Sequence, residues 1–151
     1  MTKKVMIGSV AVGGGEKVKI QSMTTCKTSD IEKCAAQTNA LAAAGCEIIR
    51  YAVLDEADAY AIKTLKTKVS IPIVADIHFS PRLAVLAVEN GADKLRINPG
   101  NIGGEKEIAL VADCIKAHHI PVRVGANTGS IEKQFFARYG RSAQALAESA
   151  L

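Results

Sequence analysis

Tryptophan is absent from the 151 residues of this sequence, and only three tyrosines and three phenylalanines supply larger aromatic rings. Proteins that bind single-stranded nucleic acids stack bases on aromatic side chains, and basic residues usually cluster on their binding surface. Here the basic residues are scattered and the net charge is only +4. The sequence therefore argues against nucleic acid as a partner and is compatible with an anionic small molecule.

Long hydrophobic runs are also missing. No stretch is long enough to cross a bilayer, and no hydrophobic segment follows Lys3 and Lys4 at the start. The cysteines show neither the Cys-x-x-Cys spacing of metal sites nor the density of a disulfide-rich domain. They are Cys26, Cys34, Cys46 and Cys114. These absences predict a cytoplasmic protein with free thiols, no membrane association and no metal site in this chain.

What is present is an alternation of strand-like and helix-like segments, typical of parallel strands joined by crossover helices. Strands are predicted over residues 17–23, 47–53, 72–79, 94–99 and 121–127. Helices are predicted over about 30–44, 55–69, 80–91 and 105–118, with a last one from about residue 142. A short hairpin or lid is predicted over residues 5–15.

Helix boundaries are marked by local signals. Ser29 and Glu32 have the spacing of a capping box, and Gly45 stands where that helix should end. Ser80 is the expected cap of a later helix, with Pro81 in its first position.

Each central strand has one apolar and one polar face. The fourth predicted strand shows this clearly, because Leu95 and Ile97 alternate with Lys94, Arg96 and Asn98. Central strands of an open doubly wound sheet are covered on both faces and are apolar throughout. A polar inner face near the strand ends is instead typical of a (βα)8 barrel. The sequence thus predicts an α/β fold of the TIM-barrel type rather than a flavodoxin-like sheet.

The length limits how much of a barrel is present. A complete (βα)8 barrel takes roughly 200 to 250 residues, so 151 residues accommodate about the first five βα units. The last predicted helix also reaches Leu151 without a glycine or a basic cap. We therefore expect residues 1–151 to be the N-terminal portion of a substrate-binding barrel that belongs to a longer protein.

Polar side chains gather at the carboxyl ends of four predicted strands. They are Arg50, Asp76, His78, Arg96, Asn98, Arg123 and Asn127. Glycine-rich turns follow at residues 99–104 and 125–130, where backbone N–H groups can approach an anion. Because a guanidinium binds phosphate oxygens two at a time, three arginines beside these turns indicate a phosphate-bearing ligand.

A purely structural interpretation competes with this one. A strand arginine is often half of a buried ion pair, and Asp76 is a possible partner. One acidic residue does not neutralise three arginines, which favours the anion site. His78 beside Asp76 is a candidate proton donor or hydroxyl-binding group, with a packed histidine as the alternative. Cys26 is interpreted as a packed thiol near the site.

Several segments closely resemble the 4-hydroxy-3-methylbut-2-enyl diphosphate synthase family: IQSMT (20–24), GCEIIR (45–50), VADIHF (74–79), LRINPGNIG (95–103) and VRVGANTGS (122–130). The resemblance implies an N-terminal (βα)8 barrel and a C-terminal domain with a four-iron four-sulfur (4Fe-4S) cluster held by three cysteines and a glutamate. It implies reduction of 2-C-methyl-D-erythritol 2,4-cyclodiphosphate to 4-hydroxy-3-methylbut-2-enyl diphosphate in the methylerythritol phosphate route to isoprenoids. Ferredoxin or flavodoxin would donate the electrons, and the complete enzyme would be a homodimer.

The resemblance also implies residue roles. Arg50, Arg96 and Arg123 would hold the substrate diphosphate, with support from Asn98 and Asn127. Asp76 and His78 would be catalytic residues near the carbon skeleton of the substrate.

Two departures from the family stand out. Thr25 and Cys26 occupy positions where the family commonly has Asn-Thr. No cysteine here matches a cluster ligand, so we expect the fragment to be inactive alone. Two other interpretations stay open: a pteridine-binding barrel of the dihydropteroate synthase type, and a half-barrel that acts as an anion-binding or assembly module.

Overall fold

The computed structural model of the chain describes residues 2–125, 127, 129, 131 and 133–150. Its centre is a five-stranded parallel sheet in which the strands follow one another in chain order. The strands are β3 (Gln21–Met23), β4 (Ile48–Val53), β5 (Ile73–Ile77), β6 (Lys94–Ile97) and β7 (Val122–Val124). Neighbouring strands that are consecutive in sequence are the arrangement of a TIM barrel, so the predicted α/β fold is confirmed.

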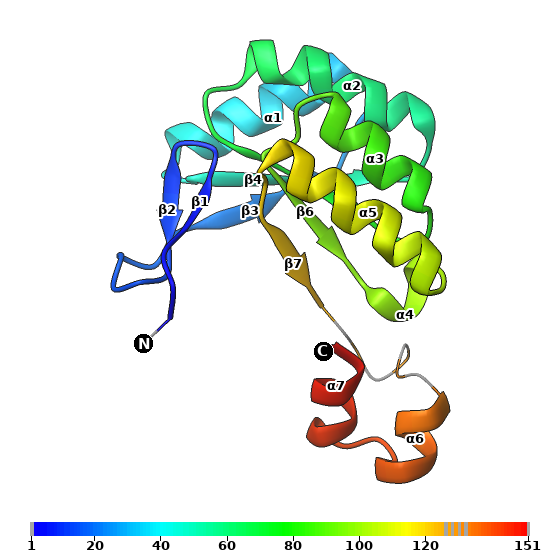
Figure 1. The fold of residues 1–151 in the computed structure, drawn as a ribbon. Coiled ribbons are helices and arrows are strands. Elements are labelled where there is room, and N and C mark those ends of the chain that lie inside the picture. The colour runs from blue at the N-terminus through cyan, green and yellow to red at the C-terminus, as the bar shows by residue number, and fades with distance from the viewer. Residues whose placement is uncertain (1, 126, 128, 130, 132, 151) are drawn as a thin grey trace.

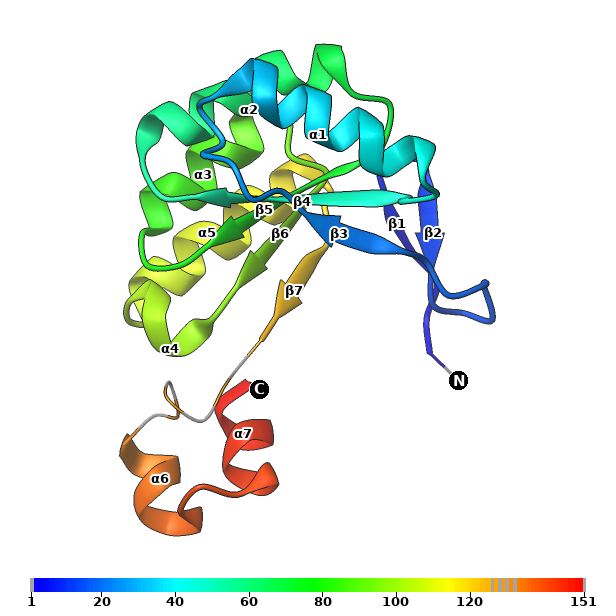
Figure 2. The same cartoon turned by 180° about the vertical axis from the view of Figure 1, so that it is seen from behind.

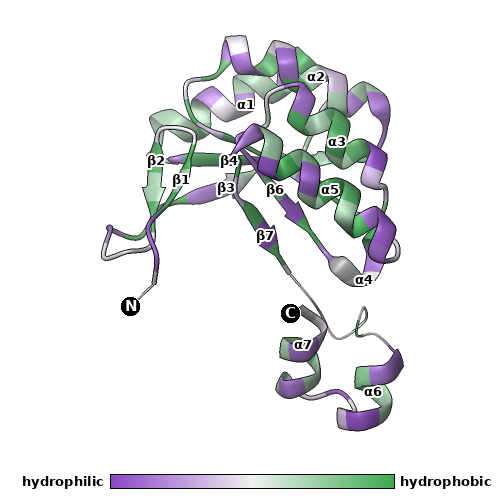
Figure 3. Ribbon diagram, in the orientation of Figure 1, coloured by the Kyte–Doolittle hydropathy of each residue, from purple (hydrophilic) through white to green (hydrophobic). Residues whose placement is uncertain are grey.

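Helices cover one face of this sheet (Figures 1 and 2). They are α1 (Ile31–Ala43), α2 (Glu56–Lys68), α3 (Pro81–Glu89) and α5 (Glu105–His118). Polar and apolar segments alternate along α3 and α5 (Figure 3), as expected for helices with one face on a sheet. Three shorter helices are α4 (Pro99–Ile102), α6 (Lys133–Tyr139) and α7 (Ala143–Ala150). The last two lie beyond the carboxyl end of β7 (Figure 1).

The main core lies between the sheet and these helices. Alternate residues of the central strands fill it: Ile49, Tyr51, Val53, Ile73, Ala75, Ile77, Leu95 and Ile97. The hydroxyl of Tyr51 lies 2.7 Å from the hydroxyl of Thr38 on α1, so the polar atom that β4 brings into this core has a partner. The other residues of each strand therefore face the opposite, inner side of the sheet.

A small hairpin closes the inner face at one end. β1 (Val5–Ile7) and β2 (Val10–Val12) pair antiparallel, which confirms the hairpin predicted over residues 5–15. Ile7 packs against Ile48 and Val74 near the amino ends of β4 and β5. The hairpin thus lies at the end of the sheet opposite to the carboxyl ends of the strands, where the polar residues were predicted.

Some predicted boundaries are wrong. The strand predicted over 17–23 has only three residues, and Val18 is 94% exposed. The predicted capping box at Ser29 does not form, because Asp30 is the cap and accepts a hydrogen bond from the Lys33 backbone. Residues 99–102, predicted as part of a turn, form α4, and α6 was not predicted. By contrast, the Ser80 cap and Pro81 at the start of α3 are confirmed.

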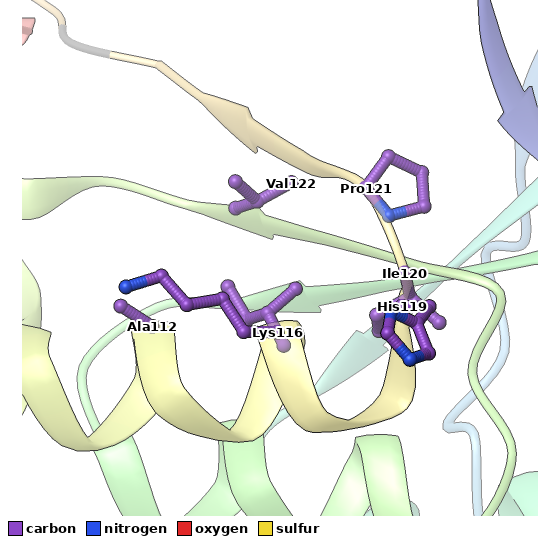
Figure 4. A pocket seen from close by; sticks show the side chains of 7 residues that line it. Ala112, Lys116, His119, Ile120, Pro121 and Val122 are labelled. Carbon is purple, nitrogen blue, oxygen red and sulfur yellow. The ribbon is translucent and has the colours of Figure 1, made fainter.

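Among the described residues, strand β7 forms an edge of the sheet. Beside it, an apolar groove of about 580 Å³ runs along α5 and is lined in part by Ala112, Ile115, Ile120, Pro121 and Val122 (Figure 4). None of the helices described here has the length and hydrophobicity needed to cross a membrane.

Candidate functional site

Asp76 is the centre of a charged cluster on the inner face of the sheet. Its side chain is almost completely buried on β5. One carboxylate oxygen lies 3.1 Å from Nη1 of Arg96 on β6, and the other lies 3.3 Å from Nε of Arg50 on β4. Arg96 is the direct cross-strand partner of Asp76, so the strand register itself places this pair. Three of the predicted site residues are therefore in contact.

His78 extends the cluster from the end of β5. Its Nε2 lies 3.6 Å from Asp76 Oδ2, which is close enough for an ion pair if the imidazole is protonated. About a third of the side chain is exposed, so it is accessible from the carboxyl end of the sheet. His78 is thus placed where it can exchange a proton with a ligand that also contacts Asp76.

Met23 was missed by the sequence analysis. Its sulfur lies 3.3 Å from Nε and 3.1 Å from Nη2 of Arg50, and the two residues are cross-strand partners on β3 and β4. A thioether is only a weak acceptor, so it orients the guanidinium without neutralising its charge. The sequence did place Met23 at the end of the first strand, but a methionine at such a position more often packs in the hydrophobic core.

Two further cations lie on the same face. Arg123 is the cross-strand partner of Arg96, and Lys94 lies next to Val74 in the register. Burial, and then the nearby charge of Arg123, lower the pKa of Lys94. No ion pair is found for either side chain within the part of the chain that the structure describes. The sequence analysis placed Lys94 on the polar face of its strand but not in the site. What marks Lys94 in the structure is a half-buried ammonium group with no carboxylate partner among the described residues.

The two asparagines organise the turns that follow β6 and β7. The buried Asn98 accepts a hydrogen bond from the Gly100 backbone through Oδ1, at 3.2 Å, and so caps α4. Asn127 accepts one from the Gly129 backbone at 3.0 Å. Residues 126, 128 and 130 of the predicted turn lie outside the described residues. Gly125 faces the Arg96 guanidinium, where a Cβ atom would lie 3.5 Å from Nε and Nη2.

The cysteines do not form a cluster site. Iron–sulfur clusters are held mainly by cysteine thiolates. Cys46 donates to the Ile48 carbonyl at 3.1 Å, and Cys114 lies beside His118. Within residues 2–125, 127, 129, 131 and 133–150, no three His, Cys, Asp or Glu side chains gather closely enough to hold a metal ion. These residues therefore do not fit a 4Fe-4S cluster.

Comparison with known proteins decides the family. Residues 2–151 match the family model described as the GcpE TIM-barrel domain. The chain belongs to the GcpE family. This match confirms the resemblance seen in the sequence, and it favours that interpretation over a pteridine-binding barrel.

Curated relatives of this GcpE chain are enzymes by name. The 4-hydroxy-3-methylbut-2-en-1-yl diphosphate synthase (flavodoxin) of Caldicellulosiruptor saccharolyticus is 53% identical over the whole chain, which covers 44% of that protein. The enzyme of the same name from Desulfotalea psychrophila is also 53% identical, over 99% of the chain and 42% of its own length. For Bacillus subtilis the identity is 49%, over 99% of the chain and 40% of the relative. The chain thus spans less than half the length of these relatives.

Proposed function

We propose that this GcpE chain is the N-terminal portion of the substrate-binding barrel of a 4-hydroxy-3-methylbut-2-enyl diphosphate synthase. In the complete enzyme it would bind 2-C-methyl-D-erythritol 2,4-cyclodiphosphate for reduction to 4-hydroxy-3-methylbut-2-enyl diphosphate. The observation that carries the proposal is the charge imbalance of the inner face. Among the described residues, Arg50 and Arg96 contact the carboxylate of Asp76, and Lys94 and Arg123 add two further positive charges on the same face without an ion pair of their own.

The imbalance is local to this face. Elsewhere several lysines pair one to one with a carboxylate, for example Lys27 with Asp55 at 2.7 Å and Lys66 with Asp93 at 2.8 Å, and a lysine without an ion pair among the described residues, such as Lys63, is exposed. A network that served stability alone would be expected to show the same balance, because an unpaired buried charge is destabilising. A diphosphate supplies the missing negative charge and offers several oxygens to forked guanidinium groups.

The residues then divide into two sets. Arg50, Arg96 and Arg123 would bind the diphosphate oxygens, and Asn98 and Asn127 would hold the two turns in shape. Asp76 would keep two of the guanidinium groups in position beside the carbon skeleton of the substrate. His78 would hold a proton near the hydroxyl group that is lost.

The 4Fe-4S cluster would supply the two electrons of the reaction in the complete enzyme. Because the described residues do not fit a cluster, we expect this chain alone to bind the substrate without converting it. By analogy with the names of the relatives, flavodoxin would be the electron donor, with ferredoxin as the alternative. We further infer that the complete enzyme is a cytoplasmic homodimer.

Isothermal titration calorimetry with the cyclodiphosphate, and with inorganic diphosphate as a minimal ligand, tests the binding role. Arg96→Ala and Arg123→Ala should each weaken the affinity by about 10- to 100-fold, because a charged hydrogen bond contributes about 1.5 to 3 kcal/mol. Lys63→Ala is the matched control, since Lys63 is exposed on α2. Unchanged affinity in both arginine variants would contradict the proposal.

A further inference from the structure

The sulfur atoms of two cysteines are in contact near the carboxyl end of β3. Cys26 lies on the loop between β3 and α1, and Cys34 lies in the first part of α1. Their Sγ atoms are 2.6 Å apart, about half an ångström more than the ~2.05 Å of a covalent S–S bond. Both are free thiols. Cys34 also donates to the Lys27 carbonyl at 3.2 Å, so its sulfur is held facing the loop.

Solvent reaches the two sulfurs unequally. Cys34 is completely buried, and burial raises the pKa of its thiol to about 12. Cys26 is partly exposed and lines an open depression together with Met23, Thr25 and Leu54. A small reagent therefore meets Cys26 first, and Cys34 is left to react with whatever group Cys26 carries.

We propose that Cys26 and Cys34 are a redox-active pair that forms a reversible disulfide by exchange with a low-molecular-weight disulfide such as glutathione disulfide. The Cys26 thiolate attacks one glutathione sulfur and expels the other as a thiolate. Cys34 then loses its proton and attacks the Cys26 sulfur, which expels the second glutathione thiolate. The two protein thiols are oxidised to one disulfide, and one glutathione disulfide is reduced to two thiols that take up both protons.

The other two cysteines do not share this geometry. Cys46 is buried and donates to the Ile48 carbonyl, and Cys114 lies beside His118 on α5. All four cysteines are among the described residues. Within this set, only Cys26 and Cys34 bring their sulfur atoms into contact.

The disulfide would tie the loop after β3 to α1. That loop begins next to Met23, whose sulfur contacts Arg50, and the Thr24 backbone donates to the Arg50 carbonyl at 3.2 Å. Oxidation therefore acts beside the candidate site, but the pair itself does not depend on what Arg50 binds.

The test treats the native protein with glutathione disulfide at about pH 8, alkylates the remaining thiols and maps tryptic peptides by mass spectrometry. Trypsin separates Cys26, in residues 20–27, from Cys34, in residues 34–50. The second peptide also contains Cys46, so the mapping uses a Cys46→Ser background. We expect a cross-link between the two peptides, lost on reduction with dithiothreitol, while far-UV circular dichroism stays that of the native protein.

Single variants separate the two steps. Cys34→Ala should stop at a glutathione adduct on Cys26, whereas Cys26→Ser should leave Cys34 unmodified because it is buried. Cys114→Ser is the matched control and should oxidise as the parent does. The proposal is overturned if both thiols remain alkylatable in the oxidised native protein, if the cross-link involves Cys114, or if Cys34 is modified in Cys26→Ser as fast as Cys26 is in Cys34→Ala.

Discussion

A single carboxylate, that of Asp76, holds two guanidinium groups from neighbouring strands. Asp76→Asn would leave Arg50 and Arg96 close together without their counter-charge. Loss of one member of a buried ion pair destabilises a protein by about 3 to 5 kcal/mol. The two arginines are each about a quarter exposed, so we expect a smaller fall in the free energy of unfolding, about 2 to 3 kcal/mol. Urea denaturation measures it.

The same variant distinguishes the anion site from a purely structural network. Inorganic diphosphate should raise the Tm of Asp76→Asn more than that of the parent, because the ligand replaces the lost negative charge. Asp30→Asn is a suitable control: asparagine still caps α1, and only the exposed pair with Lys33 is lost. If inorganic diphosphate raised the Tm of neither protein, the arginines would not be available to the ligand.

Lys94 should affect stability and binding in opposite directions. Burial and Arg123 lower its pKa below the ordinary 10.5, so the folded state disfavours the charged form that dominates at pH 7. Lys94→Met should therefore raise the free energy of unfolding at pH 7, by less than about 1 kcal/mol because the ammonium is partly solvated. The same variant should weaken the binding of inorganic diphosphate, because it removes one cation of the site.

The pH dependence gives the sign of the Lys94 effect. Between the lowered pKa of the folded state and 10.5, the unfolded chain binds more protons than the folded protein. Stability due to Lys94 therefore rises with pH across this window, and the advantage of Lys94→Met shrinks as pH 10.5 is approached. Paired urea titrations of both proteins at pH 7 and pH 10 measure this difference. If the stability advantage of Lys94→Met grew with pH instead, the lowered pKa of Lys94 would be contradicted.

At the level of the elements, the junction between α4 and α5 requires a glycine at one of two adjacent positions. Gly103 has a φ of +120°, and a Cβ there would lie 2.8 Å from Glu107 Cγ. Gly103→Ala should lower the free energy of unfolding by about 2 to 3 kcal/mol through strain and this contact. Gly104→Ala, at a φ of −89°, should change it by less than about 1 kcal/mol. If urea denaturation showed the same loss of unfolding free energy for both variants, backbone conformation would not be what makes Gly103 necessary.

Local signals predicted the elements well where no distant residue competes for the same groups. Ser80 and Pro81 fix the start of α3 as predicted, because both act within one helical turn. Ser29 is not the cap because Asp30, one residue later, accepts the Lys33 backbone N–H. The Ser29 backbone N–H, which a capping box would direct to Glu32, donates instead to the carboxylate of Asp58, 29 residues away on α2, at 2.8 Å. That contact depends on how α1 and α2 pack, which no short window of sequence contains.

In the whole molecule, the candidate cluster was predictable from alternation because parallel strands in register bring residues near their carboxyl ends together. Asp76, Arg50, Arg96 and His78 meet as that rule implies. The rule does not say which guanidinium takes which carboxylate oxygen, nor that Met23 lies against Arg50. Those contacts depend on side-chain conformations and on the stagger between strands.

The open edge of the sheet should also determine the behaviour of the chain in solution. Val122 and Val124 on β7 are 39% and 41% exposed beside the apolar groove along α5. An edge strand with unpaired backbone groups and apolar neighbours is a template for a second copy. We expect the weight-average mass from sedimentation equilibrium to rise with protein concentration, and Val122→Lys to suppress that rise. Leu110→Lys, an equally apolar exposed position on α5 outside the groove, should not; equal suppression by both variants would place the contact elsewhere.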